Sequence, residues 1–157
     1  MTADSIVIEM FYPHPVTDVW AALTSSEALA AWLMPNDFEP RVGHRFTFRT
    51  TPDSNWNGIV NCEVVALDRP RRVAYTWRGN GLDTLVTFTI EPVEGGTQLR
   101  LEHAGFEKGG KVGLTVRDLL ASGWNSRILR ERLPAFLAQQ ERSALLPDGN
   151  NQQEILS

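Results

Sequence analysis

Three side chains in this sequence could carry chemistry: His103, Glu63 and Cys62. His103 shares its parity with Leu99 and Leu101 in an alternating segment, so a strand there would place the imidazole on the apolar face. Such an imidazole either acts as a general acid or base or belongs to the core with its nitrogens hydrogen-bonded. The core histidine is the commoner case, and the sequence identifies no carboxylate partner for His103.

Glu63 and Cys62 begin a segment in which apolar residues occupy both parities. Parity therefore does not decide which side of the sheet Glu63 faces. The residue is either buried beside a positive partner or exposed at a sheet edge. Cys62 has no second cysteine for a disulfide, and no adjacent His or Asp lowers the pKa of its thiol. We expect a buried, inert thiol at Cys62.

The sequence lacks recognisable catalytic motifs. It contains no Ser-His-Asp order with nucleophile-elbow glycines, no phosphate-binding loop and no Cys/His cluster with the spacing of zinc ligands. We therefore expect no cofactor and no metal ion, and we assign no catalytic residue.

The charge balance is acidic. Lys and Arg total 15 against 19 Asp and Glu, and the net charge of -4 opposes association with nucleic acid or an anionic membrane. A groove that binds single-stranded nucleic acid interleaves aromatic residues with its basic ones. The basic cluster of Arg69, Arg71 and Arg72 has no such aromatic residues, so we interpret it as a solvent-exposed turn. Neither a run of about 18 apolar residues nor a basic leader occurs, so we expect no membrane span and no signal peptide. Together with the single cysteine, these features predict a cytoplasmic protein.

The N-terminal part of the chain predicts a strand and two short helices. Residues 5–11 are rich in β-branched and large apolar types, and Pro15 then suits the first position of an amphipathic helix. Thr24 and Glu27 have the spacing of a capping box, which predicts a second short helix that ends before Pro35.

An alternating pattern follows. Phe46 and Phe48 share one parity, and turn-forming residues separate further strands, predicted at 58–67, 72–78, 82–93 and 97–104. The fold class predicted from these patterns is α+β, with an antiparallel meander of six to seven strands.

A long helix is predicted from about residue 111 to residue 140. Its apolar residues up to Trp124 share one side, but Leu129 and Leu133 centre on a direction rotated by roughly 100°. Because Pro134 also removes a backbone donor, we expect a bend or a second buried face. Residues 143–157 are polar and predict a mobile tail, which leaves residues 1–142 as the domain.

The predicted elements imply a pocket. One helix is too narrow to cover a broad antiparallel sheet, so a sheet that curls around it leaves an apolar space between them. We predict that this space binds a ligand and is lined by Trp32, Phe48, Trp77, Phe88, His103, Leu120 and Trp124. The alternative is that the rings only pack the core. Trp77, Phe88 and Trp124 packed on one another, with no void for a guest, would count against both ligand binding and catalysis in this space.

Five segments in this order are typical of one superfamily. They are PVTDVWAALTSSEALAAW at 15–32, VGHRFTFR at 42–49, CEVVALDRPRRVAYTW at 62–77, VTFTIEPVEGG at 86–96 and the Gly123-Trp124 pair. In these segments the chain resembles the START-like (SRPBCC) helix-grip superfamily, and within it bacterial proteins similar to the C-terminal domain of the activator of heat-shock-protein-90 ATPase. The resemblance covers residues from about 6 to 140 and implies a curved antiparallel sheet around a long C-terminal helix.

The resemblance leaves three functions open, since the superfamily includes hydrophobic-ligand carriers, polyketide cyclases and aromatases, and co-chaperones. The first is binding of a small hydrophobic or aromatic molecule. The second is a cyclase- or hydrolase-type enzyme that uses His103 or Glu63 as an acid or base, and a second polar group touching His103 would favour it. An isolated His103 among Leu and Trp would favour binding alone.

The third function is a protein-interaction module, which predicts an exposed apolar patch. The two-domain activator also engages its chaperone through an additional N-terminal domain, for which this chain has no room, so we do not expect a chaperone partner. The oligomeric state is open, with a homodimer as one alternative.

Overall fold

The computed structural model describes residues 5–52, 57–79, 81–106 and 117–145. The described residues contain six strands, two short helices and a long helical stretch near the C-terminus. In chain order these are β1 (Ile6–Tyr12), α1 (Val16–Leu23), α2 (Ser26–Trp32), β2 (Arg45–Arg49), β3 (Ile59–Asp68), β4 (Arg72–Gly79), β5 (Leu82–Val93), β6 (Gly96–Ala104), an α-helical turn at 117–122, η2 (Gly123–Arg132) and α4 (Leu133–Leu145).

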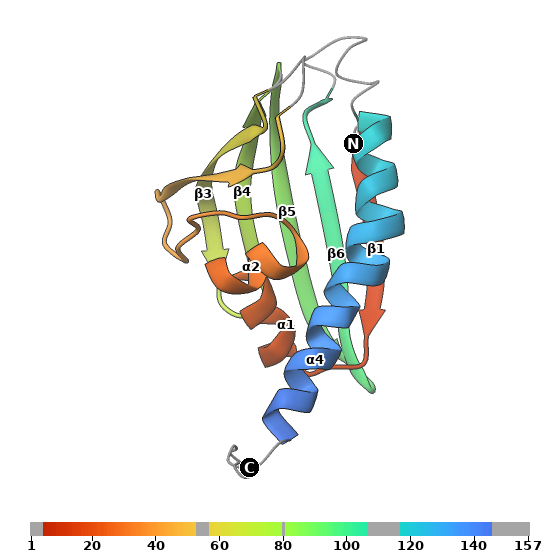
Figure 1. Ribbon diagram of the computed structural model, residues 1–157. Coiled ribbons are helices and arrows are strands. Elements are labelled where there is room, and N and C mark those ends of the chain that lie inside the picture. Colours follow the sequence, from red (N-terminus) through yellow and green to blue (C-terminus); the bar gives the residue numbers. More distant parts are fainter. Residues whose placement is uncertain (1–4, 53–56, 80, 107–116, 146–157) are drawn as a thin grey trace.

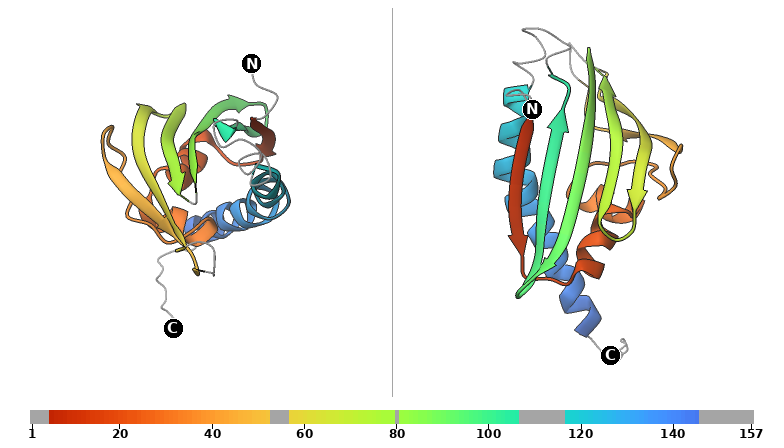
Figure 2. Two further views of the ribbon diagram at one scale, coloured as in Figure 1. Left: turned by 90° about the horizontal axis from the view of Figure 1, so that it is seen from above. Right: turned by 180° about the vertical axis from the view of Figure 1, so that it is seen from behind.

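The strands form one antiparallel sheet in the order β1-β6-β5-β4-β3-β2. Figure 1 shows the C-terminal helix running along the sheet beside β1, and the view from above in Figure 2 shows the sheet curving around toward that helix. The short helices α1 and α2 both contact α4 at the lower end of the molecule. The predicted α+β helix-grip architecture is therefore confirmed.

The concave face of the sheet carries the core. On β4 the residues Val73, Tyr75 and Trp77 are buried, as the alternation predicts. The register then continues across the sheet, since Tyr75 pairs with Val86 and Val86 pairs with His103. Tyr75 and His103 thus lie in the same row of the concave face, two strands apart.

The capping of the short helices differs in detail from the prediction. Pro15 is the N-cap of α1 and not its first helical residue. Ser25 and not Thr24 caps α2, because the Ser25 hydroxyl accepts a hydrogen bond from the backbone N–H of Ala28. The Thr24 hydroxyl is used elsewhere and donates to the carbonyl of Trp20 at 2.7 Å.

The C-terminal helix changes its winding where the apolar stripe shifts. The segment η2 is a π-helix, and the Leu133 N–H donates to the carbonyl of Ile128, five residues earlier. A five-residue spacing returns to the same face in such a helix, so Trp124 and Leu129 are both buried. The prediction offered a bend or a second buried face. The second buried face is not found, because the helix keeps one buried side and changes its winding. Pro134, which has no N–H to donate, lies directly after this segment.

The predicted domain end at residue 142 falls inside α4, which continues to Leu145. The remainder of the predicted tail, residues 146–157, lies outside the described residues. Among the described helices, none is long and apolar enough to cross a membrane.

Candidate functional site

The seven residues predicted to line a pocket come together in one core. Phe48, Trp77 and Phe88 reach it from β2, β4 and β5, and Trp32 and Trp124 reach it from α2 and η2. These five aromatic side chains and His103 are all buried, and Leu120 is half-buried against the same core. We call the five aromatic residues the aromatic layer.

Trp124 occupies the centre of this layer. Its ring centroid lies 5.8 Å from that of Trp77 and 5.9 Å from that of Phe88, in tilted and edge-to-face arrangements. Among the described residues, the best-defined cavities lie elsewhere, and none of the seven predicted residues lines them. The Trp124 ring fills the space at Trp77 and Phe88, so the structure does not show the predicted open pocket among the described residues, and the rings pack the core as in the alternative. A ligand held there must displace the Trp124 ring.

His103 lies at the end of a buried hydrogen-bonded chain. The Trp124 Nε1–H donates to His103 Nδ1 at 3.3 Å, and His103 Nε2 lies 2.8 Å from the Thr84 hydroxyl. Since an indole N–H can only donate, Nδ1 must accept, and the proton of the neutral imidazole is on Nε2. Nε2–H then donates to Thr84 Oγ1, which in turn donates to the carbonyl of Trp77 at 2.8 Å.

This chain determines what His103 can do. Burial lowers the pKa of His103 to about 3, so the imidazole is neutral at physiological pH. It touches two polar groups, the feature expected of a catalytic histidine, but both ring nitrogens are engaged and its partners are a hydroxyl and an indole. The geometry is that of a hydrogen-bonded core histidine that orients Trp124.

Glu63 faces away from the aromatic layer. Its chain neighbours Cys62 and Val64 are buried on the concave side, whereas the Glu63 carboxylate lies 3.6 Å from Arg45 on the outer side. Neither alternative foreseen for Glu63 holds in full: its side chain lies beside a positive partner but is 35% exposed, and β3 is an inner strand and not a sheet edge. Glu63 and His103 therefore lie on opposite faces of the sheet.

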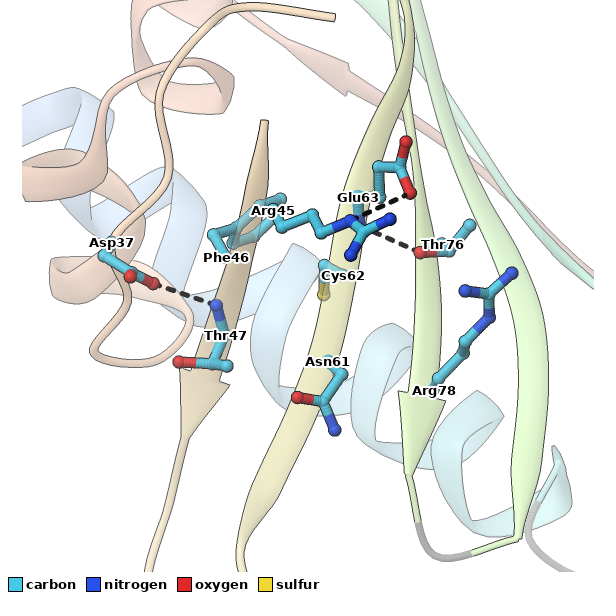
Figure 3. Close-up of a pocket in the computed structure, with 9 residues that line it drawn as sticks. All are labelled: Asp37, Arg45, Phe46, Thr47, Asn61, Cys62, Glu63, Thr76 and Arg78. Carbon is cyan, nitrogen blue, oxygen red and sulfur yellow. Dashed lines mark hydrogen bonds and ion pairs between the residues drawn. The ribbon is translucent and has the colours of Figure 1, made fainter. Parts of the chain in front are cut away.

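The outer side of β2, β3 and β4 is hollowed into a polar cavity of about 420 Å³. Figure 3 shows its lining, which consists of Asp37, Arg45, Phe46, Thr47, Asn61, Cys62, Glu63, Thr76 and Arg78. The Thr76 hydroxyl accepts a hydrogen bond from the backbone N–H of Glu63 at 2.8 Å. Both lining arginines lie beside carboxylates, Arg45 beside Glu63 and Arg78 beside Asp83 at 2.9 Å, so both positive charges of this cavity are compensated.

Cys62 is buried next to this cavity. Burial is the main cause that raises the pKa of the Cys62 thiol far above its usual value, which keeps the sulfur protonated and unreactive. The structure thus supports the expected inert thiol. Within the described residues, no group of three or more His, Cys, Asp or Glu side chains is placed to hold a metal ion.

Two polar residues of the interior were missed by the sequence analysis. Thr84 connects His103 to Trp77, and the Tyr75 hydroxyl lies fully buried in the same row as His103. Strand parity places Tyr75 on the apolar face with Trp77, and it could have placed Thr84 there with Val86, but neither was taken as a site residue. Parity could not show which hydroxyl has a hydrogen-bond partner.

Comparison with known proteins identifies relatives along most of the chain. The model of the family described as activator of Hsp90 ATPase homolog 1-like protein matches residues 13–138. Protein MLL2253 from Mesorhizobium loti is 33% identical, with a TM-score of 0.73, over 86% of this chain and 97% of that chain. Protein BH1534 from Bacillus halodurans is 30% identical, with a TM-score of 0.71, over 85% of this chain and 96% of that chain.

A more distant structure is CalU16 from Micromonospora echinospora. It is 26% identical, with a TM-score of 0.55, over 85% of this chain and 86% of that chain. A comparison with curated proteins finds no match.

Proposed function

The chain belongs to the family of activator of Hsp90 ATPase homolog 1-like proteins, and we propose that it binds a small hydrophobic or aromatic molecule between the curved sheet and the C-terminal helix. One observation carries this proposal. On the concave face of the sheet, the rings of Trp77 and Phe88 both contact one indole of the C-terminal helix, that of Trp124.

An aromatic ligand could take the place of that indole. The Trp124 ring contacts Trp77 and Phe88 edge-on or tilted, and a planar ligand of similar size would make equivalent contacts with the same two rings. Displacement costs the hydrogen bond from Trp124 to His103, which would leave Nδ1 of His103 open to the ligand.

The winding of the helix supports a movable Trp124. Trp124 lies in the first turn of η2, and π-helical segments occur frequently at functional sites because their hydrogen-bond register can differ from that of the flanking α-helix. A change from π to α winding in this segment would rotate Trp124 relative to α4.

The enzymatic alternative meets the criterion set for it, because His103 touches two polar groups, but other observations weigh against catalysis. Its two acid–base candidates, His103 and Glu63, lie on opposite faces of the sheet and cannot act on one substrate together. His103 is also neutral and hydrogen-bonded on both nitrogens. We therefore place binding before catalysis.

The proposal is tested with the protein as purified. Native mass spectrometry would detect a co-purified molecule, and a screen of aromatic and lipid-like compounds would be read by quenching of tryptophan emission. We expect saturable quenching that is reduced in Trp77→Phe and Trp124→Phe.

The matched control is Trp20→Phe. Trp20 is a buried tryptophan of α1 that does not belong to the aromatic layer, so its replacement should leave the ligand-dependent quenching in place. If no compound in the library quenches the tryptophan emission, or if only Trp20→Phe abolishes the quenching, a binding site in the aromatic layer is contradicted.

A further inference from the structure

The buried polar side chains around the sheet–helix interface offer an internal comparison. Nearly every one that reaches this interface has a hydrogen-bond partner of good geometry. The Tyr12 hydroxyl donates to the carbonyl of Leu129 at 2.7 Å, and the Trp32 indole donates to the carbonyl of Ala22 at 2.9 Å. Thr84, His103 and Trp124 satisfy one another in the chain described above.

Tyr75 is the exception among these buried polar side chains. Its side chain is fully buried, and its hydroxyl has no hydrogen-bond partner among the residues that the structure describes. The ring is enclosed by other aromatic side chains, with centroid distances of 5.3 to 6.4 Å to Phe38, Phe46, Phe48 and Phe88. Burial raises the pKa of Tyr75 well above its usual value, so the hydroxyl keeps its proton.

A buried hydroxyl without a partner destabilises a folded protein, because it gives up its hydrogen bonds to water and gains nothing in return. Phenylalanine would fill nearly the same volume at this position without that cost. The hydroxyl therefore needs a partner that the described residues do not supply, and a ligand in the same interior can supply it.

We infer that the Tyr75 hydroxyl is the polar anchor of the bound ligand, which carries one neutral oxygen or nitrogen acceptor on an otherwise apolar, aromatic frame. This inference rests on the proposed function. Phe48 and Phe88 contact the Tyr75 ring and belong to the aromatic layer, so the residue that carries the anchor adjoins the surface on which the ligand frame would pack. An ionised ligand group is disfavoured here because Tyr75 and His103 are both neutral and offer no counter-charge.

The test compares two probes of nearly the same shape, 2-acetylnaphthalene and 2-isopropylnaphthalene, by isothermal titration calorimetry. The ketone can accept a hydrogen bond from Tyr75 and the hydrocarbon cannot. We expect Tyr75→Phe to weaken ketone binding about fivefold to tenfold relative to hydrocarbon binding, the effect of one hydrogen bond. The ratio of the two affinities is the measured quantity, since it cancels effects of the substitution on the apolar frame.

Tyr12→Phe is the matched control. Both tyrosines are buried, but of the two hydroxyls only that of Tyr12 has a partner in the described part of the chain, the carbonyl of Leu129. Without probe, we expect Tyr12→Phe to lower the midpoint of thermal unfolding and Tyr75→Phe to leave it unchanged or raise it. With probe, Tyr12→Phe should keep the wild-type ratio of affinities.

The outcomes separate the two proposals. If the probes bind but Tyr75→Phe leaves their ratio within twofold of wild type, the anchor is wrong and the binding proposal stands. If Tyr75→Phe lowers the unfolding midpoint as Tyr12→Phe does, the hydroxyl has a partner in the free protein and the anchor is likewise wrong. If neither probe binds to any of the three proteins, the proposed function itself fails.

Discussion

The indole Nε1–H of Trp124 donates to Nδ1 of His103 at 3.3 Å, a hydrogen bond between side chains 21 residues apart in the sequence. It joins the C-terminal helix to β6 in the centre of the core. The bond requires a neutral imidazole, because a protonated His103 would present an N–H at Nδ1 to the Trp124 N–H. The protonation state of His103 thus determines whether this hydrogen bond between the C-terminal helix and β6 can form.

The first prediction concerns pH. Burial lowers the pKa of His103 to about 3, against 6.5 as its ordinary value in the unfolded chain. Between these values the unfolded state binds more protons, so the contribution of His103 is complete above pH 6.5 and is lost as the pH falls toward 3. The slope is at most about 1.4 kcal/mol per pH unit.

We expect the free energy of unfolding of the wild type to fall by about 2 kcal/mol more than that of His103→Gln between about pH 6.5 and pH 4.5. Urea unfolding at several pH values measures both. Parallel pH dependence of the two proteins would show that His103 titrates normally in the folded state.

The second prediction concerns Trp124→Ala. Removing a fully buried indole should lower the free energy of unfolding by about 3–5 kcal/mol and leave a cavity between Trp77 and Phe88. Added indole should fill that cavity and raise the unfolding midpoint of the variant, but not that of the wild type, in which the site is occupied.

Leu119→Ala is the control for Trp124→Ala. Leu119 lies in the helical turn before η2 and is 71% exposed, so its truncation should change stability by less than about 0.5 kcal/mol and create no response to indole. A midpoint of Trp124→Ala that indole leaves unchanged would argue that the aromatic layer collapses and cannot hold a guest.

The third prediction concerns the π-helical segment. Deletion of the exposed Ser126 would bring Trp124 and Leu129 from a spacing of five residues to a spacing of four, which suits one face of an α-helix. We expect the deletion variant to stay folded, with an unfolding midpoint close to that of the wild type by circular dichroism.

The control is deletion of Ala135, an exposed residue of α4 that already lies in α-helical winding. This deletion should shift Leu137 out of the core relative to Leu133 and lower the unfolding midpoint strongly. If the Ser126 deletion is as damaging as the Ala135 deletion, the π winding is required for the fold and is not merely an accommodation of the five-residue spacing.

The fourth prediction concerns Cys62. Because burial encloses the thiol and raises its pKa, a thiol reagent such as dithionitrobenzoate should react with the folded protein at pH 8 only slowly, at least about a hundredfold more slowly than in guanidinium chloride. The release of thionitrobenzoate measures the rate. Rapid reaction of the folded protein would show that the β2–β3 region opens readily.

The sequence by itself determined the order of the elements and the composition of the core. Alternation placed Tyr75, Trp77 and His103 on one face, and the structure confirms that these residues are buried there. The shift of the apolar stripe after Trp124 was also visible in the sequence. Such patterns can be recognised in the sequence because the side chains of strands and helices repeat their direction every few residues.

Only the tertiary structure decided the rest. The face of Glu63 depended on how β3 is paired, since the register of β3 with β4 shifts between Val64 and Ala66, leaving Val65 exposed. The partners of His103 come from β5 and η2, and the isolation of the Tyr75 hydroxyl depends on every element that surrounds it. Contacts of this kind arise from strand register and helix docking, which are set by the sum of many distant interactions and leave no trace in local spacing.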